Sequence, residues 1–424
     1  MRVGRRIADQ LLLTGHRDRV GDIGLLAELG VNAVRYPALW EHVAPRGLAA
    51  ADWSWPDRRL LELRRRGMRP VVGLLHHGHG PRGMSLLHPG FPAAFARYAA
   101  AAAQRYPWVD TWLPINEPLT TARFSGLYGW WHPHARSEPI FALMLLAQCQ
   151  AVRLAGRAIR RANPAARVLV NEDVGWTFST PPLSEPADHL NQRRWLTWDL
   201  LEGRVTPEHP LHGLLASTPA SRRLLAALAD DPEPPDLLGV DHYLTSDRFL
   251  DHRLAMYPEW AGETPYVDVE ACRMPGLPAA GLRRAIAETW QRYRRPIVLA
   301  EVALAGEPAD QVHWWNDAWQ ASLDAQAAGA DVRAVTAWAA FGGVDWHCLM
   351  REAAGLYAPG LYDASVDPPR RLPVAAAVRA TARDRLAACH GPKRRSAPAR
   401  VAPGGWWVRP DRFTFPPFRA LDRR

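Results

Sequence analysis

Short apolar runs alternate with longer stretches of helical periodicity along this chain, and this alternation constrains the fold more than any other feature. A buried strand followed by an amphipathic helix, repeated many times, builds a parallel sheet covered by helices. Seven such units over about 390 residues favour an α/β fold of the (β/α)8 (TIM) barrel type over a doubly wound sheet. The predicted strands are residues 31–36, 69–77, 109–116, 166–172, 236–245, 295–301 and 332–341. The predicted helices are residues 18–29, 56–66, 91–105, 139–162, 281–294, 310–328 and 373–388.

One strand of the eight is missing from this pattern. The helix at 18–29 should follow a first strand, yet residues 1–17 do not supply a good one. Either the barrel opens between its first and last strands, or the tail or a partner fills the gap, or the start of the gene is placed wrongly. We therefore predict a barrel over residues 1–390 whose first strand is missing or truncated.

The composition changes from about Gly391 onwards. Residues 391–405 are rich in Pro, Gly and Arg, which is typical of a linker, and residues 406–424 are rich in aromatic side chains and arginine. We predict that residues 391–424 form a C-terminal tail packed on the barrel surface, or a truncated link to a lost domain.

The charge distribution argues against a nucleic-acid partner. The formal net charge is +9, from 52 Lys and Arg against 43 Asp and Glu. A nucleic-acid binder more often gathers its basic residues on one element. The basic clusters here are short and scattered, at residues 64–66, 222–223 and 294–295. We interpret the charge mainly as solvated surface.

Neither a membrane anchor nor a secretion signal is predicted. No apolar run near the N-terminus is long enough for the core of a signal peptide, and no stretch approaches the length of a membrane span. The cysteines Cys149, Cys272, Cys348 and Cys389 are dispersed, and none forms a CxxC pair. Such cysteines suit a reducing compartment and signal neither a zinc site nor a redox motif. We expect a cytoplasmic protein.

Two carboxylates stand where predicted strands end, which is where barrels of this kind place their catalytic residues. Glu117 comes at the end of the predicted strand in the run LPINEP (113–118), and Glu301 comes at the end of the strand in PIVLAE (296–301). They end the fourth and seventh strands, counting the missing strand as the first, so they could face each other across a pocket. Hydrolysis of a glycosidic bond needs two carboxylates that flank it, about 5–5.5 Å apart in enzymes that retain the anomeric configuration.

Six segments, taken in order between about residues 16 and 388, resemble glycoside hydrolase family 1, the β-glycosidases. Any one of them is a weak signal, but six in register are a strong one. They are ELGVNAVRYPALWEHVAP (28–45), RGMRPVVGLLHH (66–77), TWLPINEP (111–118), DLLGVDHYLTS (236–246), PIVLAEVA (296–303) and AWAAFGGVDWHC (337–348).

The resemblance implies a role for each matching residue. Glu117 would be the acid/base and Glu301 the nucleophile, while Arg35 and Tyr243 would hydrogen-bond the nucleophile and keep it ionised. The sugar would be bound by Asn116 at its 2-hydroxyl, His76 at a hydroxyl, Trp338 as a platform, and Asp345 and Trp346 at its far hydroxyls. Asp241 stands where the family usually has Asn, and the loop residues Trp130 and Trp131 are further pocket candidates. No metal or organic cofactor is implied.

The sequence departs from the family's pattern at several positions. The family's pocket Gln belongs to the absent first strand, its sugar-gripping Glu is the shorter Asp345, and Val302-Ala303 replaces Asn-Gly after Glu301. These departures bear on the identity of the sugar more than on the acid/base pair. This variant also resembles modules joined to deoxysugar (dTDP-4-dehydrorhamnose) reductase-like domains in some bacteria, which implies a reductase-like partner attached at the Pro-rich tail.

Three further motifs receive a structural interpretation. Glu172 also follows Asn at a strand end, but it lacks a following Pro and belongs to the fifth strand, so we interpret it as structural or as part of the rim. His76, His77 and His79 do not predict a metal site, because alternate residues of a strand point apart and no carboxylate is paired with them. GHGPRG (78–83) has the G-x-G-x-x-G spacing of a dinucleotide-binding motif, but no predicted helix begins directly at it, so we do not predict a dinucleotide site.

Together these observations predict a retaining hydrolase acting on a β-linked glycoside by double displacement. A transglycosidase, or a tailoring enzyme of sugar or natural-product biosynthesis, would use the same carboxylate pair. A degenerate barrel that binds a saccharide or a partner protein without catalysis is the non-enzymatic alternative, since barrels host many functions.

Overall fold

The computed structural model describes residues 1–4, 6–258, 265–274, 276–277 and 281–388. Their contacts divide the chain into two compact units. The first unit comprises residues 1–172, 195–239 and 339–383, and the second comprises 173–194, 240–338 and, among the described residues, 384–388.

Four strands of the first unit form a parallel sheet. They are β3 (Ala33–Pro37), β4 (Arg69–His76), β5 (Thr111–Asn116) and β6 (Arg167–Asp173), whose last residue belongs to the second unit. Arg35 is the register partner of Val71, and His76 that of Asn116. All six residues of β5 are buried, as expected of a central parallel strand that is covered on both faces. The carboxyl ends of these strands therefore meet at one edge.

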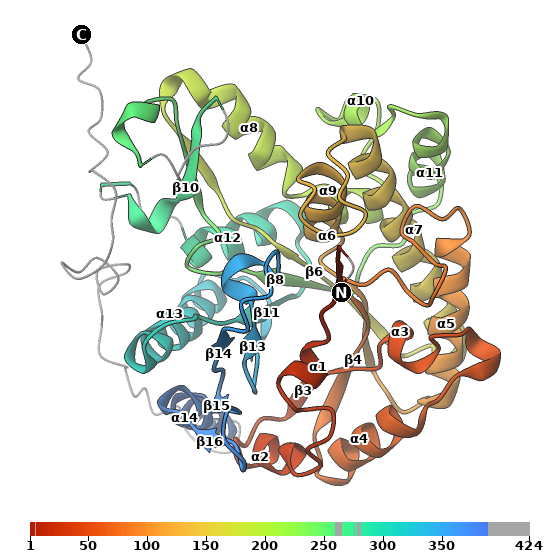
Figure 1. Cartoon of the computed structure of the whole chain (residues 1–424), viewed down its shortest axis with the longest axis vertical. Coiled ribbons are helices and arrows are strands. Elements are labelled where there is room, and N and C mark those ends of the chain that lie inside the picture. The colour runs from red at the N-terminus through yellow and green to blue at the C-terminus, as the bar shows by residue number, and fades with distance from the viewer. Residues whose placement is uncertain (5, 259–264, 275, 278–280, 389–424) are drawn as a thin grey trace. The chain divides into compact units, whose positions relative to one another are not determined.

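Helices cover these strands where the apolar spacing predicts them. In Figure 1, α4 and α5 lie outside β4. The helices of this part are α2 (Asp22–Glu28), α4 (Ser54–Arg65), α5 (Phe91–Arg105), α7 (Glu138–Ala162) and α14 (Pro373–Ala388). α2, α4, α5 and α7 begin and end within about four residues of the prediction, and α14 matches its predicted bounds.

Helix α7 corrects one expectation. Its 25 residues are long and apolar enough to cross a membrane, although the sequence was expected to hold no stretch of that length. In the structure, 72% of its most apolar window is buried, and the helix packs against α5 and against α11 (Pro219–Asp230). The apolar composition is thus that of a core helix.

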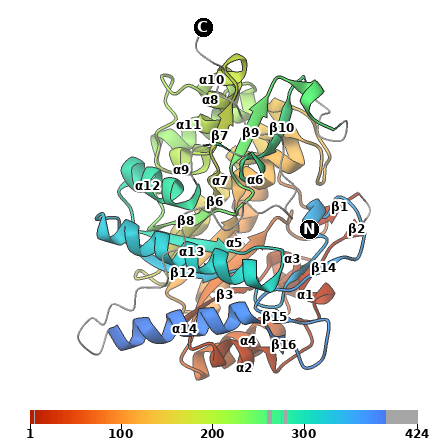
Figure 2. The same cartoon turned by 90° about the vertical axis from the view of Figure 1, so that its left-hand side faces the viewer.

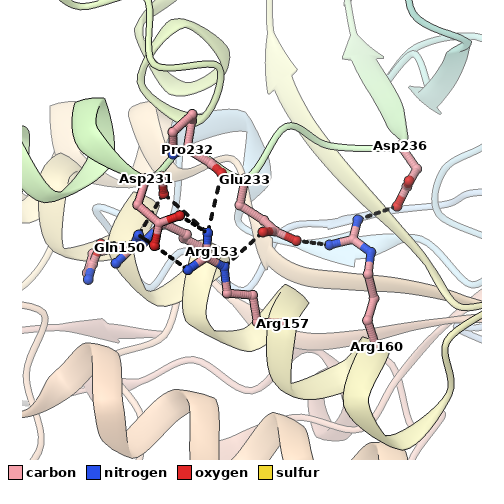
Figure 3. A network of polar contacts seen from close by, with 8 residues as sticks. All are labelled: Gln150, Arg153, Arg157, Arg160, Asp231, Pro232, Glu233 and Asp236. Atoms are coloured by element: carbon pink, nitrogen blue, oxygen red, sulfur yellow. Dashed lines mark hydrogen bonds and ion pairs between the residues drawn. The ribbon is translucent and has the colours of Figure 1, made fainter.

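An ion-pair network ties α7 to the segment that leads into the next strand (Figure 3). Arg153, Arg157 and Arg160 lie on one face of the helix, because their spacing follows its turns. Arg153 and Arg157 both pair with Asp231, and Arg160 pairs with Glu233 and with Asp236, the latter at 2.6 Å. Asp236 Oδ2 also accepts a bond from the backbone N–H of Val168 on β6, 2.7 Å away. The network therefore fixes where the next strand, β8 (Leu237–Asp241), begins.

Among its described residues, the second unit contains two further barrel strands, a small sheet and three long helices. The strands β11 (Ile297–Val302) and β12 (Val332–Ala337) pair in parallel, with an irregularity between Leu299 and Val302. The small sheet has the order β10 (Val267–Glu270), β9 (Arg248–Asp251), β7 (Thr177–Ser179). The helices are α8 (Ser184–Arg193), α12 (Gly281–Tyr293) and α13 (Pro308–Ala327).

The barrel strands are hydrogen-bonded in the order β12-β11-β8-β6-β5-β4-β3. Along the chain, each of these barrel strands is followed by one or more helices before the next barrel strand or the end of the described residues. This is the predicted (β/α)8 architecture with seven of its eight strands. β3 and β12 stand at the two ends of the order.

Residues 1–17 hold no barrel strand among those described, in agreement with the prediction. Instead, β1 (Arg2–Val3) and β2 (Arg6–Ile7) form an antiparallel hairpin, followed by the short helix α1 (Gln10–Leu13). Asp9 caps this helix by accepting bonds from the N–H groups of Leu11 and Leu12. The predicted tail at 391–424 lies outside the described residues.

Candidate active site

Glu117 directly follows β5 and adopts a strained backbone conformation. Its φ of 43° and ψ of 68° lie in the left-handed region, which costs a residue other than glycine about 1 kcal/mol or more. Pro118 follows at the first position of α6 (Pro118–Ala122), where its fixed φ suits a helix start. A π-helical turn, η2 (Arg123–Leu127), continues the helix. Strain of this kind and π turns are both concentrated at functional sites.

The imidazole of His77 lies beside the Glu117 carboxylate. Its Nε2 lies 3.5 Å from Glu117 Oε2, and its Nδ1 lies 2.8 Å from the Thr121 hydroxyl. Burial, with a smaller contribution from Arg35, lowers the pKa of His77 to about 3. The imidazole is therefore neutral near pH 7, so this contact is polar and not an ion pair.

Asn116 stands at the centre of a buried polar cluster. Its side-chain oxygen accepts bonds from the guanidinium of Arg35 and, at 2.7 Å, from the amide of Asn171. Its Nδ2 lies 3.4 Å from Nε2 of His76 and 3.2 Å from Nε2 of His77. Burial and nearby positive charge lower the pKa of His76 well below its usual range. The cluster thus holds Arg35, His76 and Asn116 together, as the sequence predicts for one site.

Glu172 supports the backbone that follows the acid/base position. Its Oε1 accepts bonds from the N–H of Leu119 and the hydroxyl of Thr197, each 2.6 Å away. The side chain is buried, and burial raises its pKa to about 7. This agrees with the interpretation of Glu172 as structural, because its donors belong to the start of α6 and to α9 (Leu196–Leu201).

Two tryptophans from different loops pack near His77: Trp346 follows β13 (Gly343–Val344), and Trp131 follows η2. The Trp346 and His77 ring centroids are 6.1 Å apart, and those of Trp131 and His77 are 4.9 Å apart. Trp131 is 1% exposed and donates its Nε1–H to the carbonyl of Leu349, so it supports His77 from within the protein core. Trp130 packs against Phe124 outside this cluster.

Asp345 follows β13 directly and is almost fully buried. Its Oδ2 lies 3.1 Å from Nη1 of Arg6, a residue that the sequence analysis does not single out. Its Oδ1 accepts a bond of 3.0 Å from the N–H of Leu356. Both oxygens of Asp345 therefore have partners within the first unit.

In the second unit, Glu301 lies near the end of β11 and is 3% exposed. The hydroxyl of Tyr243 donates a hydrogen bond to Glu301 Oε2, as the resemblance implies. The rings of Tyr243 and Trp338 meet edge to face, with centroids 6.3 Å apart. Asp241 is fully buried at the end of β8, and its carbonyl accepts a bond from the N–H of Val174. The second unit therefore gathers Glu301, Tyr243 and Trp338.

Sequence reasoning missed His77 as a site residue. The sequence analysis considered His77 only as a metal ligand and argued that alternate residues of a strand point apart, which applies only while the strand continues. β4 ends at His76, and His77 has a φ of 54°, so both imidazoles reach Asn116. Within the described residues, no group of three or more His, Cys, Asp or Glu side chains is arranged to hold a metal ion.

Comparison with known proteins identifies the relatives of this architecture. Residues 15–195 match the sequence model of Glycosyl hydrolase family 1. The chain is 22% identical to Beta-glucosidase 14 of Arabidopsis thaliana over 370 residues, which cover 77% of this chain and 73% of that protein. It is 24% identical to a 6-phospho-beta-glucosidase of Dickeya chrysanthemi over 316 residues, which cover 68% of this chain and 64% of that protein.

Solved structures share the fold. Beta-glucosidase from Thermotoga maritima in complex with cyclophellitol superimposes with a TM-score of 0.70 and 15% sequence identity, covering 90% of this chain and 88% of that chain. Its complex with azafagomine gives a TM-score of 0.71, also at 15% identity, covering 87% of each chain. The chain thus has the barrel fold of these β-glucosidases.

Proposed function

We propose that this chain is a glycoside hydrolase that cleaves a β-linked glycoside with retention of configuration. The observation that carries the proposal is the setting of Glu117, a carboxylate held at a strand end in a left-handed conformation beside the neutral His77 and the Asn116 cluster. The match of residues 15–195 to Glycosyl hydrolase family 1 and the shared fold support the same reaction class.

In the first step, a Glu301 carboxylate oxygen attacks the anomeric carbon while the Glu117 carboxyl donates its proton to the departing glycosidic oxygen. The C–O bond to the leaving group breaks, and a glycosyl ester forms on Glu301. In the second step, water attacks the same carbon, Glu117 takes a proton from it, and the ester bond breaks. Proton and charge return to their starting positions after one turnover.

The residues around the two carboxylates have supporting roles in this scheme. The Tyr243 hydroxyl orients Glu301 through the hydrogen bond to Oε2. The strained turn and the neutral His77 fix the direction of the Glu117 carboxyl without adding a fixed charge. Trp338 offers an aromatic face for the apolar side of a sugar ring, and Asn116 offers its amide to a hydroxyl.

The test uses 2-deoxy-2-fluoro glycosides with activated leaving groups, which form the glycosyl ester but hydrolyse it slowly. We expect the intact mass to rise by one fluorosugar, the modified peptide to contain Glu301, and E301Q to show no gain. E172Q is the matched control, because Glu172 is also a buried carboxylate at a strand end, and it should keep the adduct. A folded protein without an adduct for gluco, galacto, fuco and manno reagents would contradict the proposal.

We further propose a cytoplasmic location and a deoxysugar reductase-like partner. The location is supported by the cysteines, since among the described residues Cys149, Cys272 and Cys348 are free thiols. The partner is supported only by the sequence resemblance stated above. Cell fractionation followed by affinity capture of the full chain tests both, and recovery in a membrane or extracellular fraction would contradict the location.

A further inference from the structure

Helix α6 begins directly after Glu117, which therefore stands at the N-cap position of this helix. An N-cap residue usually has an extended backbone, and its own side-chain oxygen accepts a bond from the N–H group two or three residues further on. Glu117 differs in both respects, because its backbone is left-handed and its side chain makes no capping hydrogen bond. The N–H groups at the start of α6 therefore depend on another acceptor.

Glu172, near the end of β6, supplies that acceptor. Its Oε1 accepts the N–H of Leu119 at 2.6 Å, and the N–H of Thr120 also donates to this carboxyl. The hydroxyl of Thr197 on α9 donates to the same Oε1 at 2.6 Å and so holds the carboxyl in place. Helix α6 packs against α7 and α9, and Figure 2 shows these three helices close to β6. A side chain from a neighbouring strand thus does what the N-cap side chain does in most helices.

The other backbone groups of this turn are also held, two of them by buried side chains. Oδ1 of Asn171 accepts the N–H of Glu117 at 3.4 Å. Nε2 of Gln148 on α7 donates to the carbonyl of Pro118 at 3.0 Å. The carbonyl of Glu117 accepts the N–H of Thr121 at 3.0 Å, as the N-cap carbonyl of a helix does. A left-handed backbone at a residue other than glycine persists where its surroundings over-determine it, and these contacts do so here.

Two positions compete for the Glu117 carboxyl. In the first, Oε2 lies 3.5 Å from Nε2 of His77, which is where the structure places it. In the second, the carboxyl would bind the N–H groups of Leu119 or Thr120 and cap its own helix. That position attracts a carboxylate, because the unpaired N–H groups and the positive end of the helix dipole both favour it. Since Glu172 already occupies the second position, Glu117 takes the first.

We propose that Glu172 is a positioning residue for the acid/base: by capping α6 in place of Glu117, it keeps the Glu117 carboxyl from binding its own helix and leaves it directed at the glycosidic oxygen. The inference rests on the proposed function, since it takes Glu117 as the proton donor. Proton transfer depends steeply on where the donor lies, and a shift of about 1 Å can cost about a hundredfold in rate. Loss of the cap should therefore weaken proton transfer more than the attack of Glu301.

The test compares phenyl and 2,4-dinitrophenyl β-glycosides of the gluco, galacto, fuco and manno series on E172M, which removes both carboxyl oxygens. Phenolate needs a proton from the acid/base to leave, whereas dinitrophenolate leaves without one. We expect kcat/KM to fall about tenfold or more for the phenyl glycoside and to stay within about threefold for the dinitrophenyl glycoside. For the latter, kcat should fall and sodium azide should restore it. Azide needs no general base to attack the anomeric carbon of the ester, and it releases Glu301 and a glycosyl azide.

Three further variants separate positioning from folding, and near-UV circular dichroism checks the fold of each. E172Q keeps an oxygen that can accept the N–H of Leu119, so it should restore both substrates to within about threefold of the wild type. T218A is the matched control, because α11 also begins with proline and is capped by its own Thr218 hydroxyl. It should lower the melting temperature without separating the two substrates. T197V removes the hydroxyl that holds Oε1 of Glu172, and it carries the test at about threefold if E172M does not fold.

Crystal structures of E172M and T197V test the same inference without turnover. We expect the Glu117 carboxylate to leave His77 and to accept the N–H of Leu119 or Thr120 at about 3 Å. Equal losses for both glycosides in E172M, the same separation in T218A, or a Glu117 carboxylate that stays beside His77 in both crystals would each overturn the inference. A wild type that hydrolyses neither glycoside and forms no fluorosugar adduct would disprove the proposed function. The crystal structures would then still decide whether Glu172 positions the carboxyl.

Discussion

His77 lies 3.5 Å from Glu117, and the two residues have left-handed backbones with φ of 54° and 43°. Each directly follows one of two neighbouring parallel strands, so the turns after β4 and β5 bring an imidazole and a carboxylate together. Burial keeps the imidazole neutral by lowering its pKa to about 3. Glu117 therefore has a polar neighbour whose charge stays constant while the carboxyl gives up and regains a proton.

The first prediction concerns His77→Gln. We expect kcat/KM for aryl β-glycosides to fall about tenfold, because a polar neighbour 3.5 Å from the acid/base carboxylate is altered. The number of limbs in the pH profile between about pH 5 and 8 should stay the same, because a group with a pKa of about 3 does not titrate there. His212→Gln, a substitution on the short helix α10 (His212–Leu215), is the control. If the pH profile of His77→Gln lost its acidic or its basic limb, His77 would titrate in this range, and the assignment of a neutral imidazole would be wrong.

The strands and helices of the barrel could be predicted because their apolar periodicity is local. All seven predicted strands exist, and the errors lie at their ends. The strand predicted over 236–245 stops at Asp241, because the N–H of Tyr243 bonds to the Ser246 hydroxyl and starts a turn. Helix α11 was missed, although Thr218 and Ser221 form a capping box at its start.

Residues of the candidate site could be predicted only where they belong to a recognisable sequence motif. Asn116 and Glu117 stand in such a motif, and so does Tyr243, whose bond to Glu301 was expected from the resemblance. Arg6 has no local signal, because it meets Asp345 across 339 positions of sequence. A hairpin of two-residue strands leaves too little periodicity to reveal that it lies against β13 and its loop.

The second prediction concerns Tyr243→Phe. Loss of the hydroxyl removes the hydrogen bond to Glu301 Oε2 and leaves the nucleophile less well oriented. We expect the rate of fluorosugar adduct formation to fall about tenfold or more, with little change in the melting temperature. Tyr257→Phe is the matched control in the same unit, since its hydroxyl bonds to the buried Asp251 at 2.8 Å. An equal loss of rate in both variants would point to a general structural effect.

The third prediction uses the buried carboxyl of Glu172. Its pKa is raised to about 7 from 4.5, mainly by burial. A raised pKa means that the folded state favours the proton, so the associated stability is present below about pH 4.5 and is lost as the pH rises through 7. The wild-type protein should lose up to about 3 kcal/mol of unfolding free energy over this range through Glu172. Glu172→Gln has no carboxyl at this position, so its unfolding free energy should not show this loss. Denaturant titrations at pH 5 and 7.5 check this, and parallel curves for both proteins would contradict it.

The last prediction tests the packing that holds the π-helical turn after the acid/base. A Cβ added at Gly126 would lie 2.9 Å from the Cα of Phe141 on α7, a backbone atom that cannot move aside alone. Gly126→Ala should therefore lower the unfolding free energy by about 1–3 kcal/mol and also reduce kcat, because η2 continues the helix that starts at Glu117. Gly213→Ala on α10 is the matched control, since nothing lies within 4 Å of its Cβ and alanine favours a helix. Equal stability in the two variants would show that the turn can shift away from α7, and the close approach at Gly126 would then not be what fixes the position of Glu117.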